Sequence, residues 1–199
     1  MKMICGLAAL LAFQVASAQG PATAGNDNGD DATFSVGGFQ VSPRVGKTML
    51  HVNAGVLRSG SGGDFDTLLG GVNLSYTLPA GVMADLGFGS QGNWGHLGLE
   101  DRYQLREYTL AAGYQFNTPH GFVITPKVGR SQWALYSRSA VFARPVSGQP
   151  DTLRGYQNFW ELSIQKRVRD VAALGVMFKD NHYDFGDVRS VAFTASFYL

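Results

Sequence analysis

The feature that most constrains this chain is an alternation of apolar residues with small or polar ones, which runs from Lys47 to the last residue. A period of two is typical of β-strands whose two faces meet different surroundings. The pattern recurs in eight stretches, each close to the ten or so residues that a tilted strand needs to cross a bilayer. In the fifth stretch, Trp133 and Tyr136 interrupt the alternation and predict a bulge. The predicted strands are 47–58, 65–78, 82–91, 103–116, 122–136, 156–167, 173–183 and 189–199.

The connections between the predicted strands alternate in length. Three are short turns, at 79–81, 117–121 and 169–171. Four are longer and polar, at 59–64, 92–101, 138–155 and 181–188. Transmembrane barrels combine short periplasmic turns with larger external loops. The sequence therefore predicts an all-β fold, an eight-stranded antiparallel up-and-down transmembrane β-barrel.

The two faces of the predicted strands decide between a membrane barrel and a soluble, lipocalin-like one. One face is large and apolar, and we assign Leu50 and Val52 to it on the first strand and Phe193 on the last. The other face is rich in Gly, Ala, Ser and Thr. A soluble barrel would expose that polar face to water, yet only 16% of the chain is charged, against about a quarter in soluble domains. We therefore expect the apolar face to meet lipid and the small polar face to fill a narrow lumen.

The N-terminal residues predict export. Lys2, the apolar run 6–16 and the small residues before Gln19 together form a signal peptide, 1–18. The only cysteine lies inside it, so the exported chain forms no disulfide. We interpret 19–45 as a flexible leader and 46–199 as the barrel, although part of the leader, from Phe34 onward, could add a strand. Net charge near zero gives no indication of a nucleic-acid partner.

On this pattern, the region from Lys47 onward resembles the small eight-stranded outer-membrane proteins of Gram-negative bacteria, the OmpA-type transmembrane domains and the Ail/Lom group. The last residues, 197–199, are similar to the aromatic-ended signal that the barrel-assembly machinery reads, although that signal usually ends in Phe or Trp. A closing strand must also be bonded to its final residue, because hydrocarbon tolerates no unpaired backbone.

The resemblance implies a monomer in the outer membrane that contacts lipids and lipopolysaccharide. It implies a structural or surface-interaction role, in adhesion or envelope integrity. The external loops would bind any host or surface ligand, and the longest, 139–155, is the best candidate because loops on a rigid scaffold commonly carry function. A narrow non-specific channel is the alternative role.

Charges on the predicted inner face form the first candidate site. Buried charges are tolerated when they are paired, so we expect a polar network in the lumen. It would be either a plug that holds the barrel together or a gate, and the narrowness of eight strands favours the plug. Its residues are Asp85, Glu107, Lys127, Glu161, Arg167 and Lys179.

Arginines near the predicted external ends form the second candidate site. Guanidinium groups bind phosphates in bidentate fashion, and lipopolysaccharide presents phosphates at that level. The alternative is an ordinary solvated surface. The predicted contacts are Arg58, Arg106, Arg130, Arg138, Arg154 and Arg189, with Arg102 nearby.

Catalysis and metal binding are weakly supported. Lipid A deacylases and palmitoyltransferases also use eight-stranded barrels. The corresponding candidates here would be His182, with Asp180, Asp184 and Asp187 close by, and His96 in the second external loop. However, Asp184 stands where the deacylases have Ser. The four histidines lack zinc-site spacing, and 180–187 lacks the order of a calcium-binding loop. No phosphate-binding or nucleotide motif occurs, and we expect no enzyme activity, metal or cofactor.

Overall fold

The computed structural model describes residues 38–57, 62–93, 102–138, 147–169 and 171–199. The predicted signal peptide, 1–18, and residues 19–37 of the predicted leader lie outside them. Among the described residues there is no helix long and apolar enough to span a membrane. Their strands are β1 (Gly38–Val52), β2 (Gly63–Thr77), β3 (Val82–Gly92), β4 (Arg102–Tyr114), β5 (Phe116–Asn117), β6 (Phe122–Arg138), β7 (Thr152–Arg169), β8 (Ala172–Tyr183) and β9 (Gly186–Tyr198).

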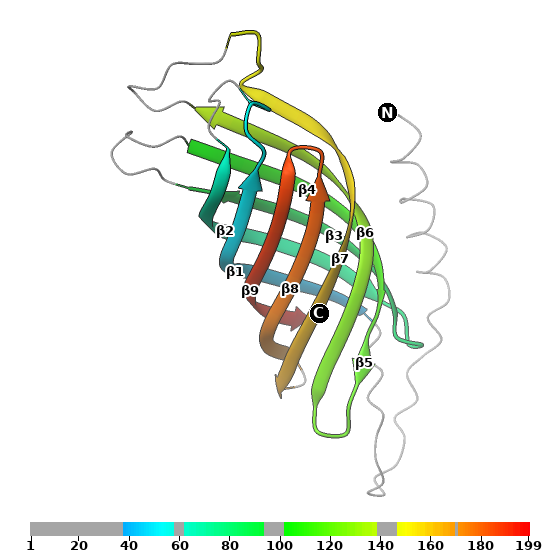
Figure 1. Cartoon of the computed structure of the whole chain (residues 1–199). Coiled ribbons are helices and arrows are strands. Elements are labelled where there is room, and N and C mark those ends of the chain that lie inside the picture. The colour runs from blue at the N-terminus through cyan, green and yellow to red at the C-terminus, as the bar shows by residue number, and fades with distance from the viewer. Residues whose placement is uncertain (1–37, 58–61, 94–101, 139–146, 170) are drawn as a thin grey trace, which may run out of the picture. The chain divides into compact units, whose positions relative to one another are not determined.

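The strands form one antiparallel sheet that closes into a barrel (Figure 1). β5 continues the line of β4 past Gln115, so the wall has eight strands. β9 closes the barrel against β1, and Leu199 N donates to Phe39 O at 2.9 Å. The closing strand is thus bonded to its last residue, and the predicted eight-stranded antiparallel barrel is confirmed. We call the end with the β2–β3 turn the inner end, and the opposite one the outer end.

The strand register fixes the geometry of the wall. We start at Met49 on β1 and move from each residue to its pairing partner on the next strand. After one circuit of the barrel the path returns to β1 at Phe39, which is ten residues nearer the inner end than Met49. The path runs through Met49, Arg189, Asp180, Trp160, Val128, Ala112, Ala84, Tyr76 and Phe39. A displacement of this size over eight strands tilts them by about 40° and leaves a lumen that side chains fill.

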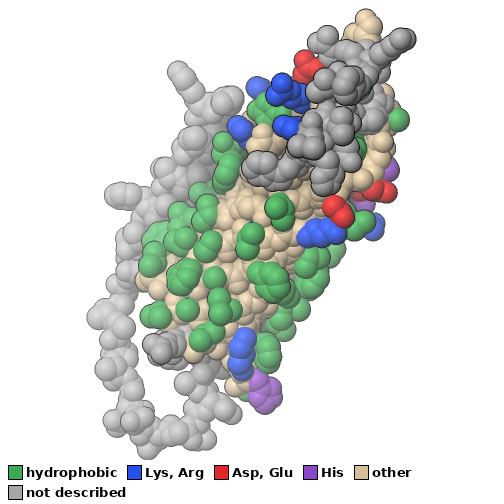
Figure 2. All heavy atoms as spheres, turned by 90° about the vertical axis from the view of Figure 1, so that its left-hand side faces the viewer, with side chains coloured by type: hydrophobic (Ala, Val, Ile, Leu, Met, Phe, Trp, Pro, Cys, Tyr) green, Lys and Arg blue, Asp and Glu red, His purple; other side chains and the backbone are tan. Residues whose placement is uncertain are grey.

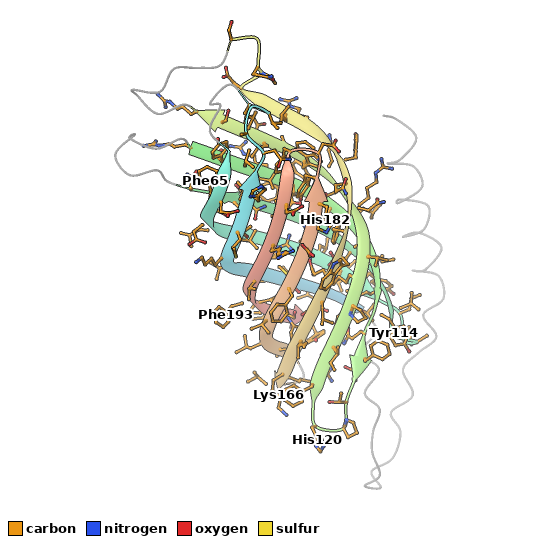
Figure 3. The ribbon with its side chains drawn as sticks, in the orientation of Figure 1. Phe65, Tyr114, His120, Lys166, His182 and Phe193 are labelled. Carbon is orange, nitrogen blue, oxygen red and sulfur yellow. The ribbon has the colours of Figure 1, made fainter. Side chains whose placement is uncertain are left out.

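The outer surface of the wall carries an apolar belt (Figure 2). Leu110 is 49% exposed and Phe193 is 72% exposed, and Phe193 points away from the barrel in Figure 3. Glu107 and Glu161 are 3% and 4% exposed, inside the lumen. Apolar side chains therefore face outward and small polar ones inward, as predicted. The outer limit of the apolar belt is marked on each wall strand by the first outward-facing residue that is polar. These border residues are Lys47, Asp66, Ser90, Arg106, Arg130, Asn158, Asp180 and Arg189.

The observed strand β1 differs from the first predicted strand in its bounds and in which side chains face the lumen. It begins at Gly38, so residues 38–45 belong to the barrel rather than to a leader, and they add no ninth wall strand. Leu50 and Val52, which we assigned to the lipid face, are 0% and 1% exposed and face inward, whereas Met49 is 57% exposed. The sequence assignment was wrong because the lumen itself is apolar at the outer end, so hydrophobicity does not mark the lipid face there.

Two other expectations are wrong. The last outer connection is not a long loop: β8 and β9 are joined by the two residues Asp184 and Phe185, and Phe185 is fully buried. The fifth predicted strand has no bulge, because β6 keeps an unbroken register with β4 and β7. Trp133 faces inward and Tyr136 outward, and the alternation looked broken only because an aromatic residue occupies an inward position.

Candidate functional site: a filled lumen and a polar outer surface

A network of ion pairs crosses the middle of the lumen. Lys127 Nζ lies 3.1 Å from Asp85 Oδ2 and 3.2 Å from Glu161 Oε1. Arg44 Nη1 lies 3.1 Å from Glu161 Oε2, and Ser75 Oγ donates to Asp85 at 2.5 Å. These four charged side chains are at most 8% exposed. Two cations therefore face two carboxylates, and we call this group the central network.

A second charged group lies nearer the outer end. Lys179 Nζ is 3.1 Å from Glu107 Oε1, and Asn181 Nδ2 donates to the same oxygen at 3.2 Å. Tyr183 donates its hydroxyl proton to Glu107 as well. The Lys179 ammonium also lies 4.5 Å from the centre of the Phe159 ring. This Glu107 cluster is charge-balanced, as the central network is.

An apolar cluster closes the lumen at its outer end. The Trp133 ring packs edge-on against Tyr183 and Phe185, at 5.5 Å and 4.9 Å between ring centres. The cluster members are at most 6% exposed, so they exclude water from the level above the Glu107 cluster. We call the group the apolar cap: Leu50, Val52, Leu57, Tyr103, Leu105, Trp133, Leu135, Tyr183, Phe185 and Val188.

Uncharged polar side chains fill the inner end of the lumen. Gln165 Nε2 donates to Ser196 Oγ at 2.7 Å, and Ser196 and Ser42 share a hydrogen bond of 2.9 Å. A cavity of about 20 Å³ lies between this group and the central network, which is room for about one water molecule. The lumen is therefore layered: polar at the inner end, charged in the middle and apolar at the outer end.

The structure brings five of the six predicted lumen charges into the two charged groups and leaves one apart. Arg167 lies at the inner end, where its guanidinium stacks on Tyr198 at 5.4 Å and reaches Asn117 Oδ1 at 3.5 Å. Sequence reasoning missed Arg44, because 19–45 was interpreted as a leader. The alternation of Gln40, Ser42 and Arg44 with apolar neighbours is the signal that could have revealed it.

The predicted arginines separate into two settings. Arg102, Arg106, Arg130, Arg138 and Arg154 are exposed on β4, β6 and β7, whose described outward positions hold no Asp or Glu. We call them the arginine face.

Two arginines of this face stack on tyrosine rings. Arg106 lies over Tyr136 at 5.4 Å, and Arg130 lies over Tyr156 at 5.2 Å. The stacks hold both guanidinium groups against the wall, at and just above the border of the apolar belt. Arg58 lies outside the described residues.

The other side of the outer surface, on β8, β9, β1 and β2, pairs its charges internally. Lys47 Nζ is 2.9 Å from Asp66 Oδ2, and Arg189 Nε is 3.6 Å from Asp180 Oδ1. His51 pairs with Asp64 at 2.7 Å. Arg189, predicted to contact lipopolysaccharide with the others, therefore already has a carboxylate partner.

Of the catalytic candidates, His182 and Asp187 form a simple cross-strand pair, and His96 lies outside the described residues. His182 Nδ1 lies 2.8 Å from Asp187 Oδ1, and both side chains face outward (His182 in Figure 3). The hydrogen bond to Asp187, with the charges of Asp187 and Asp180, raises the pKa of His182 above its usual value, and the same bond lowers the pKa of Asp187. His51 and Asp64 repeat the arrangement. Among the described residues, no group of three or more His, Cys, Asp and Glu side chains is placed to hold a metal.

Known proteins resemble this chain in structure rather than in sequence. No family model and no curated protein sequence matches it. Neisserial surface protein A superposes with a TM-score of 0.63 at 9% identity, over 81% of this chain and 97% of that one.

Two further barrels are similar. For Ail of Yersinia pestis, solved with the heparin analogue sucrose octasulfate, the TM-score is 0.53 at 13% identity, over 81% of this chain and 99% of that one. For the N-terminal barrel domain of Pseudomonas aeruginosa OprF it is 0.51 at 11% identity, over 82% and 99%. This chain has the fold of the small eight-stranded outer-membrane β-barrel proteins.

Proposed function

We propose that this chain is an integral outer-membrane protein with a non-catalytic, structural role in the envelope, anchored by lipopolysaccharide bound to the arginine face. The apolar belt supports residence in a bilayer, because eight outward strands of Leu, Val and Phe are stable against lipid rather than water. Insertion would proceed through the barrel-assembly machinery, for which the aromatic end of β9 is the proposed signal. A signal peptide cleaved near Ala18 would direct export.

The observation that carries the lipopolysaccharide proposal is a pair of like charges. Arg102 and Arg138 are directly opposite each other in the β4–β6 register, and both are exposed on the outer surface. Two like charges in such positions destabilise a sheet by about 0.2–1 kcal/mol. A phosphate bound between them would remove this repulsion and gain charge-assisted hydrogen bonds. In the proposed membrane orientation, the phosphates of lipopolysaccharide would lie at the level of this surface.

Stability measured with and without lipopolysaccharide tests this proposal. Arg138→Gln should raise the free energy of unfolding by about 0.2–1 kcal/mol in phospholipid alone, since it removes the repulsion. The same variant should reduce the extra stability that added lipopolysaccharide gives.

A variant outside the arginine face serves as the matched control. Arg189→Gln, whose arginine is already paired with Asp180, should leave the lipopolysaccharide effect within about twofold. Equal lipopolysaccharide effects in the wild type and in an Arg106→Gln/Arg130→Gln/Arg138→Gln variant would contradict the proposal.

A filled lumen supports a structural role over a channel. Both charged groups are balanced and buried, and the apolar cap lies between them and the outer end. Ions would have to pass the Trp133, Tyr183 and Phe185 rings, which are in mutual contact. In planar bilayers we expect the purified chain to give no steady unitary conductance. Steady channels of uniform size would favour the alternative role.

The proposal of a non-catalytic role has its own test. His182 and Asp187 form an exposed pair with no hydroxyl nucleophile in their described contacts. We expect lipid A to keep its mass when lipopolysaccharide is incubated with the protein. A deacylated or palmitoylated product in the mass spectrum would instead support an enzyme.

A further inference from the structure

β7 is longer than the strand beside it. Its pairing with β8 ends at Trp160, opposite Asp180, whereas its pairing with β6 continues outward to Thr152. In Figure 1 the β6–β7 pair extends beyond the turn between β8 and β9. Among the described residues, no strand pairs with the second edge of residues 152–159. This stretch lies above the border of the apolar belt, where no hydrocarbon requires its backbone to be paired.

The backbone groups at this edge can be assigned by parity. Ser137 N donates to Asp151 O and Arg167 N donates to Gly121 O, both at 2.9 Å, so odd-numbered residues of β7 bond to β6. Successive residues of a strand direct their N–H and C=O to opposite edges. The even-numbered residues therefore direct theirs to the open edge, and they are Thr152, Arg154, Tyr156 and Asn158.

The side chains around the open edge determine which kind of strand could pair with it. The even-numbered residues face outward, where Arg154 is exposed and Arg130 lies over Tyr156. The odd-numbered ones face inward, where Leu153 packs on the apolar cap and Phe159 is 6% exposed. A strand added here would have one face beside arginines and the other over apolar side chains.

We propose that the open edge of β7 at residues 152–159 binds an extended peptide segment of another protein, in which acidic and apolar residues alternate. The peptide adds one strand to the wall, its backbone pairing with the four even-numbered residues. Its acidic side chains lie outward, beside Arg154 and Arg130, and its apolar ones lie inward. Charge complementarity selects an acidic segment, because the outward described positions of β4, β6 and β7 carry cations and no carboxylates.

A synthetic peptide of alternating Asp and Val, seven residues long and fluorescently labelled, tests the proposal on the full chain in lipopolysaccharide-free phospholipid nanodiscs. We expect saturable binding, together with slower hydrogen exchange at the amides of Arg154, Tyr156 and Asn158. A peptide N-methylated at every amide should not bind, because neither of its edges can donate a backbone hydrogen bond to β7.

Two variants locate the site. Tyr156→Pro removes one N–H from the open edge and leaves the bonds to β6 in place, so affinity should fall by about tenfold or more. Arg154→Glu should weaken the Asp–Val peptide by about fivefold or more, since it places like charges opposite each other. Lys47→Glu, the same charge change on β1, should alter affinity by less than about twofold. Heat-modifiable gel mobility checks that each variant is folded.

Three results would overturn the proposal. The first is equal binding of the N-methylated peptide, and the second is full affinity in folded Tyr156→Pro. The third is protection of the same amides without any peptide, rising with the number of protein copies per vesicle, which would make a second copy of this chain the occupant.

Discussion

At the scale of single residues, the charges of the central network and the Glu107 cluster matter because each has a buried partner of opposite charge. Lys127 lies between two carboxylates, those of Asp85 and Glu161. Replacing it by Met leaves two buried negative charges with less compensation, and such a loss costs about 3–5 kcal/mol. We expect Lys127→Met to lower the free energy of unfolding by that amount, measured by urea titration of folded and unfolded gel bands.

An exposed lysine gives the matched control. Lys47 pairs with Asp66 on the surface, where its side chain is 64% exposed, and surface pairs contribute about 1 kcal/mol or less. Lys47→Met should therefore change stability little. Equal losses in the two variants would mean that the central network does not stabilise the barrel.

The pair of His182 and Asp187 makes a pH-dependent prediction. Because the hydrogen bond to Asp187 raises the pKa of His182 above 6.5, the protonated pair favours the folded state. Its contribution is complete below the ordinary pKa of histidine and is lost as pH rises through the raised pKa. An NMR titration of the imidazole should show the raised value, and Asp187→Asn should lower it. An unchanged pKa in Asp187→Asn would exclude Asp187 as the cause.

At the scale of elements, most strands could be predicted from alternation, and β1 shows where alternation fails. Pro43 lacks an N–H and is unfavourable within a strand, and the structure accommodates it where β1–β9 pairing is interrupted, at Ser42 and Pro43. Farther along, the apolar cap places Leu50 and Val52 inside. Alternation gives the period of a strand but not which face meets lipid when both faces are apolar.

Cysteine labelling tests the facing of β1. A membrane-impermeant maleimide should modify His51→Cys, which lies above the belt and is exposed, and should spare Leu50→Cys until the protein is unfolded. Neither position lies in the charged groups of the lumen. Rapid modification at Leu50→Cys with protection at His51→Cys would mean that Leu50 faces outward, as we assigned it from the sequence.

At the scale of the whole molecule, the fold was predictable and the site was predictable in part. Eight alternating stretches fix the number of strands, because one missing strand would leave open edges. The five lumen charges could be predicted from the sequence because they lie on the strand face that is rich in small residues, and that face was assigned to the lumen. The division of the arginines could not be found, since it depends on the exact register of neighbouring strands, which places Arg189 beside Asp180 and Arg102 opposite Arg138.

The central claim is that the outward side chains of the wall face lipid and the inward ones fill the lumen, and tryptophan fluorescence in brominated phospholipid tests it directly. Trp160 is outward and 50% exposed, whereas Trp133 is 4% exposed within the apolar cap. In a variant that keeps only Trp160, with Trp94→Phe and Trp133→Phe, we predict strong quenching by bromine. In a variant that keeps only Trp133, with Trp94→Phe and Trp160→Phe, we predict weak quenching. Strong quenching of Trp133 with none of Trp160 would contradict the account.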